Sequence, residues 1–300
     1  MRSQKPPRGA IRIETYAGLD PYVHAFASGA FNLVVLLGDP GLQKSRVVRD
    51  VLPKACWIEG AATAFGMYKR LFEYRDQPIV VDDVDSLYSN PAAVRLLKCL
   101  CQTDARKSVA WETDSPALDK EGIPRRFTTS SSVMIVANAW RTLDANVQAL
   151  EDRGHVLHFA PSGLEVHART AQWFWDQEVF DWIGSQMHLV ERPSMRLYHA
   201  AWELKRAGLD WRSGLLGRWM SGGRLLAARI RADDAFASEE ERAAAFVARG
   251  GGCRATYFNH VRGLRPKTPV PGFILTAREP ASGRAARREG GGGIRRRAGG

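Results

Sequence analysis

The segment GDPGLQKS, residues 38–45, directly follows the apolar run Leu33–Leu37 and nearly matches the phosphate-binding pattern G-x-x-x-x-G-K-[ST]. In a loop of this kind, backbone N–H groups point at phosphate oxygens, and the positive end of the following helix strengthens the attraction. The pattern places Lys44 at the β- and γ-phosphates of a nucleoside triphosphate and the Ser45 hydroxyl at Mg²⁺. The residues expected to bind the nucleotide are therefore Gly38, Asp39, Pro40, Gly41, Leu42, Gln43, Lys44 and Ser45.

Gln43 occupies the position where this pattern usually has its second glycine. Gly38 and Gly41 still permit tight turns, so the glutamine is costly only if the loop needs a positive φ at residue 43. Taken alone, the loop is compatible both with a nucleotide site and with a chance match. The choice between them depends on the strands that surround it.

A pair of carboxylates follows a second apolar run, Ile79–Val81. Metal-assisted phosphoryl transfer needs one carboxylate to hold Mg²⁺, directly or through water, and a second to orient or deprotonate the attacking water. We assign Asp82 to the metal and Asp83 to the water.

Three further side chains complete the expected constellation. Asn138 ends the apolar run Val133–Ala137, so in a parallel sheet it would lie beside the two aspartates and fix the attacking water. Arg153 precedes another apolar run and suits an arginine finger that reaches the γ-phosphate of a neighbouring subunit; the alternative is an ordinary surface arginine. Arg196 opens a helix in the tryptophan-rich region and either reaches the nucleotide or forms a local salt bridge.

The elements that must position these residues are strands alternating with helices. Continuous apolar runs of this kind fit strands that are buried on both faces of a parallel sheet. Residues 1 to about 30 are expected to form a loop and a short helix, Pro21–Ser28. Six tryptophans at helical spacing between residues 164 and 220 indicate the core of an all-helical subdomain. The expected strands are Leu33–Leu37, Cys56–Ile58, Ile79–Val81, Val133–Ala137 and His155–Phe159.

The order of these motifs resembles that of AAA+ ATPases over about residues 20 to 220. The sequence that surrounds the motifs resembles ATPases of phages and mobile elements. The resemblance implies a five-stranded parallel sheet of order 5-1-4-3-2 with a helical lid, and ATP hydrolysis with Mg²⁺ in a homo-oligomer. It also implies that Asn138 is the sensor-one residue, Arg153 the finger and Arg196 the sensor-two residue.

Two residues depart from the family pattern. Minichromosome maintenance helicases resemble this loop and have a small side chain in place of the same glycine, where this chain has Gln43. Replication initiator ATPases resemble it in having Asp-Asp, where many relatives have Glu at the position of Asp83. The shorter aspartate bears on the rate of hydrolysis more than on binding.

Residues 237–265 are predicted to form two short helices joined by Gly250-Gly251-Gly252, the first capped by Ser238 and Glu241. This is a helix-turn-helix arrangement, and its second helix resembles recognition helices in DNA-binding domains of transposition and regulatory proteins. The alternative is a plain helical hairpin with polar outer residues. The side chains expected to contact DNA are Arg254, Thr256, Asn259 and Arg262.

The positive charge is concentrated at the C-terminal end. The net charge is +11, and residues 261–300 contain ten Lys or Arg against two Glu. Such an end either attracts a polyanion such as DNA or is a solvated, disordered tail. The predicted organisation is an N-terminal extension (1–30), an ATPase core (31–162), a helical lid (163–232), a helix-turn-helix-like segment (233–265) and a basic disordered tail (266–300).

The function expected from this pattern is ATP hydrolysis coupled to DNA or to a DNA-bound partner in replication, helicase loading or transposition. Two alternatives stay open: an assembly scaffold that binds ATP without hydrolysing it, and a remodeller whose substrate is a polypeptide. The four cysteines form no zinc-binding pattern, and no apolar run is long enough to span a membrane. With no signal peptide visible at the start, we expect a cytoplasmic protein.

Overall fold

The structure is a computed structural model, and it describes most of the chain up to residue 264. The gaps in that part are residues 1–5, 8, 61, 85–89, 113–115, 139–152, 191 and 221; beyond it, residues 272, 273, 275, 277 and 278 are described.

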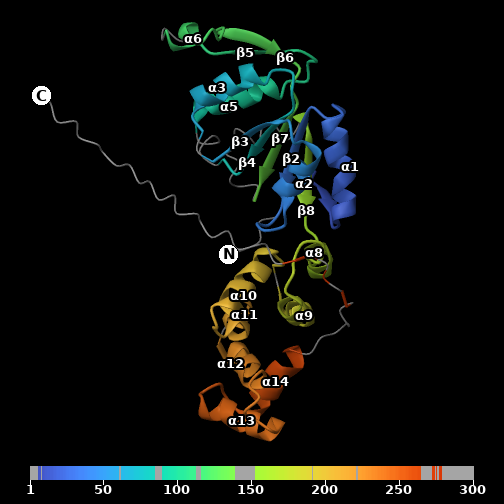
Figure 1. Cartoon of the computed structure of the whole chain (residues 1–300), viewed down its shortest axis with the longest axis vertical. Helices are drawn as coiled ribbons and strands as arrows, with labels where there is room; N and C mark the ends of the chain where they lie inside the picture. Colours follow the sequence, from blue (N-terminus) through green and yellow to red (C-terminus); the bar gives the residue numbers. More distant parts are fainter. Residues whose placement is uncertain are drawn as a thin grey trace, which may run out of the picture.

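The core is a six-stranded parallel sheet of order β1-β8-β2-β7-β4-β3 (Figure 1). The five expected strands are present in the expected relative order, and the predicted α/β fold class is confirmed. The expected count of five is wrong by one, because a short sixth strand pairs with the outer edge of β8. The strands are β1 (Ile11–Ile13), β2 (Leu33–Leu37), β3 (Cys56–Glu59), β4 (Ile79–Asp82), β7 (Val133–Ala137) and β8 (His155–Phe159).

Both faces of the sheet are buried, which explains the continuous apolar strands. Leu33, Val35 and Leu37 of β2 pack on one side with helices α3 (Ala64–Glu73) and α5 (Pro91–Leu100). Val34 and Leu36 pack on the other side with α1 (Tyr16–Ala27) and α2 (Lys44–Val51).

Helix α1 begins five residues before the predicted start at Pro21. Its true start is set by Thr15, whose hydroxyl accepts a hydrogen bond from the Gly18 N–H at 3.0 Å. Pro21 therefore lies inside the helix, where it removes one backbone hydrogen bond. The buried face of the helix, formed by Tyr16, Leu19, Val23 and Phe26, outweighs that loss by packing on the sheet.

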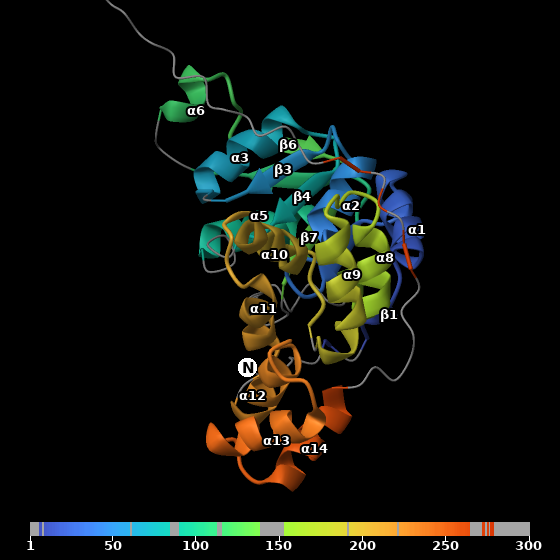
Figure 2. The same ribbon diagram turned by 60° about the horizontal axis from the view of Figure 1, so that its bottom comes forward.

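A separate antiparallel hairpin is inserted before β7. It consists of β5 (Lys107–Ala110), a short helix α6 (Ala117–Lys120) and β6 (Arg126–Thr129), and it lies over α3 and α5 in two views (Figures 1 and 2). The buried ammonium of Lys107 fastens the hairpin, because it donates hydrogen bonds to the Asn32 side chain and to the Ser131 carbonyl. This hairpin was not predicted from the sequence.

The helical lid follows β8. It contains α8 (Gly163–Thr170), α9 (Gln177–Ser185), the 3₁₀ turn Met187–Leu189, α10 (Arg196–Arg206) and α11 (Trp211–Trp219). All six tryptophans belong to or pack against its core, as predicted. No helix in the described part of the chain is long and apolar enough to cross a membrane.

Three C-terminal helices share a small core of their own. Helix α12 (Gly222–Arg231) packs against α13 (Glu239–Ala248) and α14 (Arg254–Leu264). Tyr257 of the last helix is fully buried in this core, and the neighbouring Phe258 is partly buried against it. The Tyr257 hydroxyl donates a hydrogen bond to the Glu239 carboxylate at 3.0 Å, which ties α14 to the start of α13.

Part of the predicted disordered tail is held on the lid. The Gln177 side-chain amide donates to the Phe273 carbonyl at 2.9 Å and accepts from the Leu275 N–H at 3.1 Å. The Phe273 ring packs edge-on against His167 at 5.6 Å. One glutamine thus binds two backbone groups of the chain, as a neighbouring strand would. Most of the tail lies outside the described residues.

We predict that Gln177→Ala accelerates hydrogen exchange at the Leu275 amide by roughly five- to tenfold, because the variant removes one hydrogen-bond acceptor. Residue-resolved exchange measurements check this. The matched control is Gln102→Ala, which truncates an exposed glutamine far from the lid. Equal exchange rates at Leu275 in the wild type and in Gln177→Ala would show that the glutamine does not hold the segment.

Candidate nucleotide site

The predicted phosphate loop connects the end of β2 to the start of α2, as the motif requires. Gln43 adopts a left-handed backbone conformation, with φ 57° and ψ 26°. The loop therefore does need a positive φ at this residue, and glutamine is strained where glycine would be free. The strain is on the order of 1 kcal/mol, which a folded protein tolerates at a single residue.

The loop is held from both sides by backbone hydrogen bonds. The Tyr16 hydroxyl of α1 donates to the Leu42 carbonyl at 3.0 Å, and the Met195 N–H of the lid donates to the Gly41 carbonyl at 2.9 Å. The lid is so close that a β-carbon at Gly41 would lie 2.1 Å from the Ser194 hydroxyl. Glycine is required there by the approach of the lid as well as by its φ of 82°.

The Lys44 ammonium is buried at the centre of the site. It donates hydrogen bonds to the Gly38 carbonyl at 2.7 Å, the Asp39 carbonyl at 3.0 Å and the Asn138 side-chain oxygen at 3.1 Å. Burial lowers the pKa of Lys44 to about 8, against the attraction of Asp82. All three donors of the ammonium are therefore satisfied by the protein itself.

The two aspartates occupy different environments. Asp82 is half-buried, and it lines the pocket together with Ser45. Burial raises the pKa of Asp82, and the nearby Ser45 hydroxyl partly opposes this shift. Asp83 is exposed, adopts a left-handed φ of 53°, and accepts a hydrogen bond from the Asn138 amide at 3.1 Å. Asn138 therefore bridges Lys44 and Asp83.

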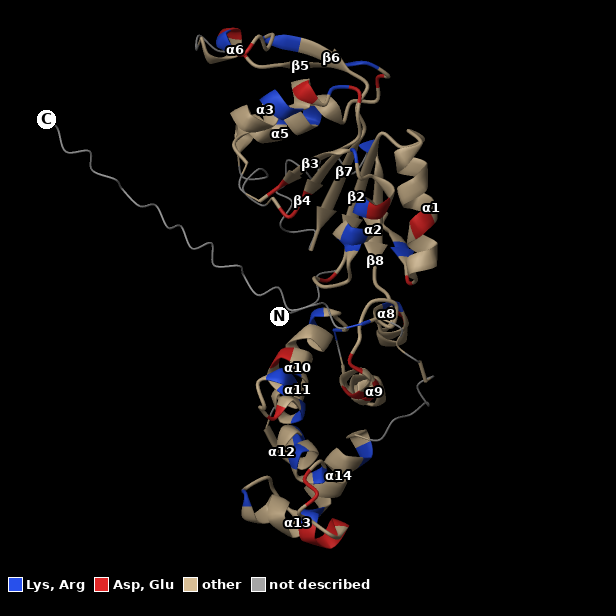
Figure 3. Ribbon diagram, in the orientation of Figure 1, with Lys and Arg blue, Asp and Glu red and all other residues tan. Residues whose placement is uncertain are grey.

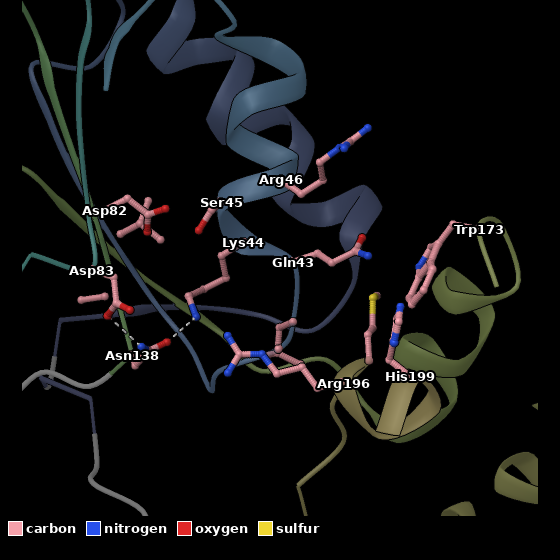
Figure 4. A pocket seen from close by; sticks show the side chains of 15 residues that line it. Gln43, Lys44, Ser45, Arg46, Asp82, Asp83, Asn138, Trp173, Arg196 and His199 are labelled. Atoms are coloured by element: carbon pink, nitrogen blue, oxygen red, sulfur yellow. Dashed lines mark hydrogen bonds between the residues drawn. The ribbon is translucent and has the colours of Figure 1, made fainter. Parts of the chain in front are cut away.

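These residues line one pocket of about 590 Å³ between the sheet and the lid (Figure 4). Of the predicted loop residues, Gly38, Asp39 and Pro40 do not line it, although the first two hold Lys44 through their carbonyls. The predicted residues that do line it are Gly41, Leu42, Gln43, Lys44, Ser45, Asp82, Asp83, Asn138 and Arg196.

Arg196 reaches the pocket from the first turn of α10. Its guanidinium points toward Asn138 and the end of Lys44 (Figure 4), and its charge contributes to the lowered pKa of Lys44. The local salt bridge considered from the sequence is not formed with any carboxylate in the described part of the chain.

Arg153 is the one predicted catalytic residue outside this pocket. It lies before β8, at the opposite end of that strand from Phe159, which approaches the phosphate loop. Its guanidinium is exposed and contacts the Lys98 carbonyl at 3.5 Å. Arg153 therefore does not act on the pocket of its own chain.

The sequence analysis missed three lid residues that line the pocket: Trp173, Met195 and His199. Trp173 was assigned to the lid core, and it does pack there, but it also faces the pocket. His199 lies one helical turn after Arg196, and that spacing was an available signal for a second pocket residue.

The residues present fit a magnesium–nucleotide complex. The Ser45 hydroxyl and the Asp82 carboxylate are oxygen ligands of the kind that Mg²⁺ prefers, and both line the same pocket. The described residues contain no cluster of three His, Cys, Asp or Glu side chains that could hold a metal alone. Magnesium is commonly bound by one or two protein ligands together with phosphates and water, which is what this pair can supply.

The predicted DNA-contacting residues lie along α14. Asn259 and Arg262 are exposed, whereas Thr256 is half-buried beside Cys253. Arg254 forms an ion pair with Glu240 at 3.0 Å, and three glutamates occupy the first turn of α13 (Figure 3). The surface of this helix pair therefore carries both signs of charge.

Comparisons with known proteins are weak. No protein-family model matches the sequence. An uncharacterised 36.7 kDa protein of the nrdC–mobD intergenic region of Enterobacteria phage T4 is 26% identical over 121 residues, which cover 37% of this chain and 37% of the phage protein. The AAA domain of FIGL-1 in complex with ADP has a TM-score of 0.36 at 14% identity, covering 85% of this chain and 84% of that chain. Another structure of that domain has a TM-score of 0.31 at 14% identity, with coverage of 79% and 72%.

The lowered pKa of Lys44 predicts a pH-dependent stability. The pKa of Lys44 is about 8 in the folded protein and 10.5 in its ordinary state. At pH values between these two, the unfolded chain binds one more proton at this residue than the folded chain. The contribution of Lys44 to the free energy of unfolding therefore rises with pH. The difference in unfolding free energy between wild type and Lys44→Met should rise by roughly 1–3 kcal/mol between pH 8 and pH 10. Denaturant titrations measure it, and a difference that stays flat or falls over this range would contradict the burial of a charged ammonium.

Proposed function

We propose that this chain is an AAA+ ATPase that binds ATP with Mg²⁺ in the pocket between sheet and lid and hydrolyses it. The observation that carries the proposal is the convergence of the phosphate loop, Asp82, Asp83, Asn138 and the lid arginine Arg196 on one pocket. Their side chains come from three neighbouring parallel strands and the lid, as this chemistry requires.

Each residue has a role that follows from its position. Loop N–H groups and the start of α2 bind the phosphates, and Lys44 moves its hydrogen bonds from the Gly38 and Asp39 carbonyls to phosphate oxygens. Asp83 and Asn138, which already contact each other, orient the attacking water. Ser45 and Asp82 would hold Mg²⁺, which neutralises charge on the phosphates when bound.

The lid links the nucleotide to conformational change. Arg196 can bind the γ-phosphate only while the lid lies against the loop, and loss of that phosphate removes its anionic partner. Arg153 cannot reach its own pocket, so we assign it as a finger for a neighbouring copy in a homo-oligomer.

A non-hydrolysing assembly scaffold is the second candidate. The observation that favours it is Asp83, a short carboxylate on a left-handed residue that Asn138 already engages. Both candidates bind ATP, so turnover separates them.

Coupling to DNA is the third part of the proposal. Exposed Asn259 and Arg262 on α14 offer base or phosphate contacts, and the basic C-terminal residues add electrostatic attraction. The glutamates of α13 act against that attraction, which leaves a polypeptide substrate as the alternative. Replication, helicase loading and transposition all use this kind of site.

Purified protein with Mg²⁺ should hydrolyse ATP, and Lys44→Ala should reduce turnover at least a hundredfold, because the variant removes the charge that binds the transferred phosphate. Asp83→Asn should reduce turnover while ATP binding persists. Phosphate release assays measure both, with Lys54→Ala as the matched control at an exposed lysine. Binding without turnover in the wild type, with and without DNA, would favour the scaffold.

Arg262→Ala should weaken binding to duplex DNA about tenfold and reduce the dependence of affinity on salt. Fluorescence anisotropy at two salt concentrations tests this, with Arg218→Ala of the lid helix α11 as the control at an exposed arginine. Equal DNA affinity of wild type, Arg262→Ala and a variant lacking residues 236–300 would contradict the assignment of DNA binding to this segment.

A further inference from the structure

The pocket has two chemically different ends (Figure 4). One end contains Lys44, Ser45, the two aspartates and Asn138, which suit phosphates and a metal. The other end is formed by two aromatic rings of the lid, Trp173 and His199. Met195 of the lid also lines the pocket. Charged groups at one end and flat aromatic rings at the other match the two halves of a nucleotide.

The Gln43 side chain lies between these ends. It leaves the loop from the residue before α2 and runs toward Trp173 (Figure 4). It makes no cap hydrogen bond to α2, and within the described residues its amide has no hydrogen-bond partner. A glycine would build the same left-handed loop with less strain, so what glutamine adds is an amide directed into the pocket.

An amide has the donor and the acceptor that one edge of adenine requires. Glutamine can accept a hydrogen bond from the adenine N6 amino group while it donates to N7, and aromatic rings bind the flat face of a base. Guanine presents the O6 and N7 acceptors on the same edge, so the amide oxygen would be left facing an acceptor.

We propose that Gln43 selects the nucleobase: it reads adenine by its amide, with Trp173 and His199 forming the stacking surface. This inference rests on the proposed ATP site and names the residue that makes it specific for adenine. The departure of the loop from the usual glycine is then a specificity feature of this chain.

The test compares the affinities of ATP, GTP and inorganic tripolyphosphate, measured by calorimetry with Mg²⁺. The wild type should bind ATP about tenfold more tightly than GTP. Gln43→Gly keeps the backbone conformation of the loop, and it should bring the ATP-to-GTP affinity ratio close to one. Its ATP-to-tripolyphosphate ratio should fall about tenfold. Gln43→Glu, which keeps the acceptor and removes the donor, should also lower the ATP-to-GTP ratio. Gln102→Gly is the control, at an exposed glutamine outside the pocket.

The outcomes separate this inference from the proposed function. If the wild type binds ATP and tripolyphosphate, Lys44→Ala binds neither, and the ATP-to-GTP ratio is the same in wild type and Gln43→Gly, the nucleotide site stands and the role of Gln43 is wrong. If the wild-type protein binds ATP and GTP equally tightly, the proposed role of Gln43 is also wrong. A wild type that binds neither ATP nor tripolyphosphate overturns the proposed function, and this inference with it.

Discussion

The buried ammonium of Lys44 is the interaction on which the rest of the site depends. A charge removed from water is stable only when its donors are paired, and three oxygens satisfy this one. Two are loop carbonyls and the third belongs to Asn138, at the end of the neighbouring strand β7. Asn138 in turn binds Asp83 beyond the next strand, β4. The strand order β2-β7-β4 is therefore what brings Lys44, Asn138 and Asp83 into one hydrogen-bonded chain. In the proposed mechanism, phosphate oxygens replace the two loop carbonyls as hydrogen-bond acceptors of the Lys44 ammonium.

The second constraint is the contact between loop and lid. The Met195 N–H donates a hydrogen bond to the Gly41 carbonyl. Because Gly41 has no side chain, the lid can approach closely enough for Arg196 to line the pocket. On the other side, Tyr16 holds the Leu42 carbonyl from a helix that packs on the sheet. The phosphate loop is thus held between helix α1, which packs on the sheet, and the helical lid. In the proposed mechanism, a change in what the loop binds is transmitted to the lid through the Gly41–Met195 hydrogen bond and through Arg196.

Much of the sheet could be predicted from the sequence, because strands buried on both faces appear as uninterrupted apolar runs such as Leu33–Leu37. The strand Ile11–Ile13 could not, since three residues with one buried side chain give too little pattern. The start of α1 was misplaced because proline usually marks a first turn, whereas here tertiary packing of Tyr16 and its neighbours overrides the local cost. The sequence motif could not show that Gln43 adopts a left-handed backbone, nor that Trp173, Met195 and His199 line the pocket. The pocket contacts of these three residues depend on how the lid packs over the loop.

A crystal structure with Mg²⁺ and a non-hydrolysable ATP analogue would show whether the phosphate loop and Lys44 bind a triphosphate. We expect the triphosphate along residues 38–45, with the Lys44 ammonium turned from the Gly38 and Asp39 carbonyls to phosphate oxygens and Arg196 at the γ-phosphate. We also expect the metal at Ser45 and Asp82. A nucleotide bound elsewhere, or one bound here while Lys44 keeps both carbonyls as its partners, would contradict the account.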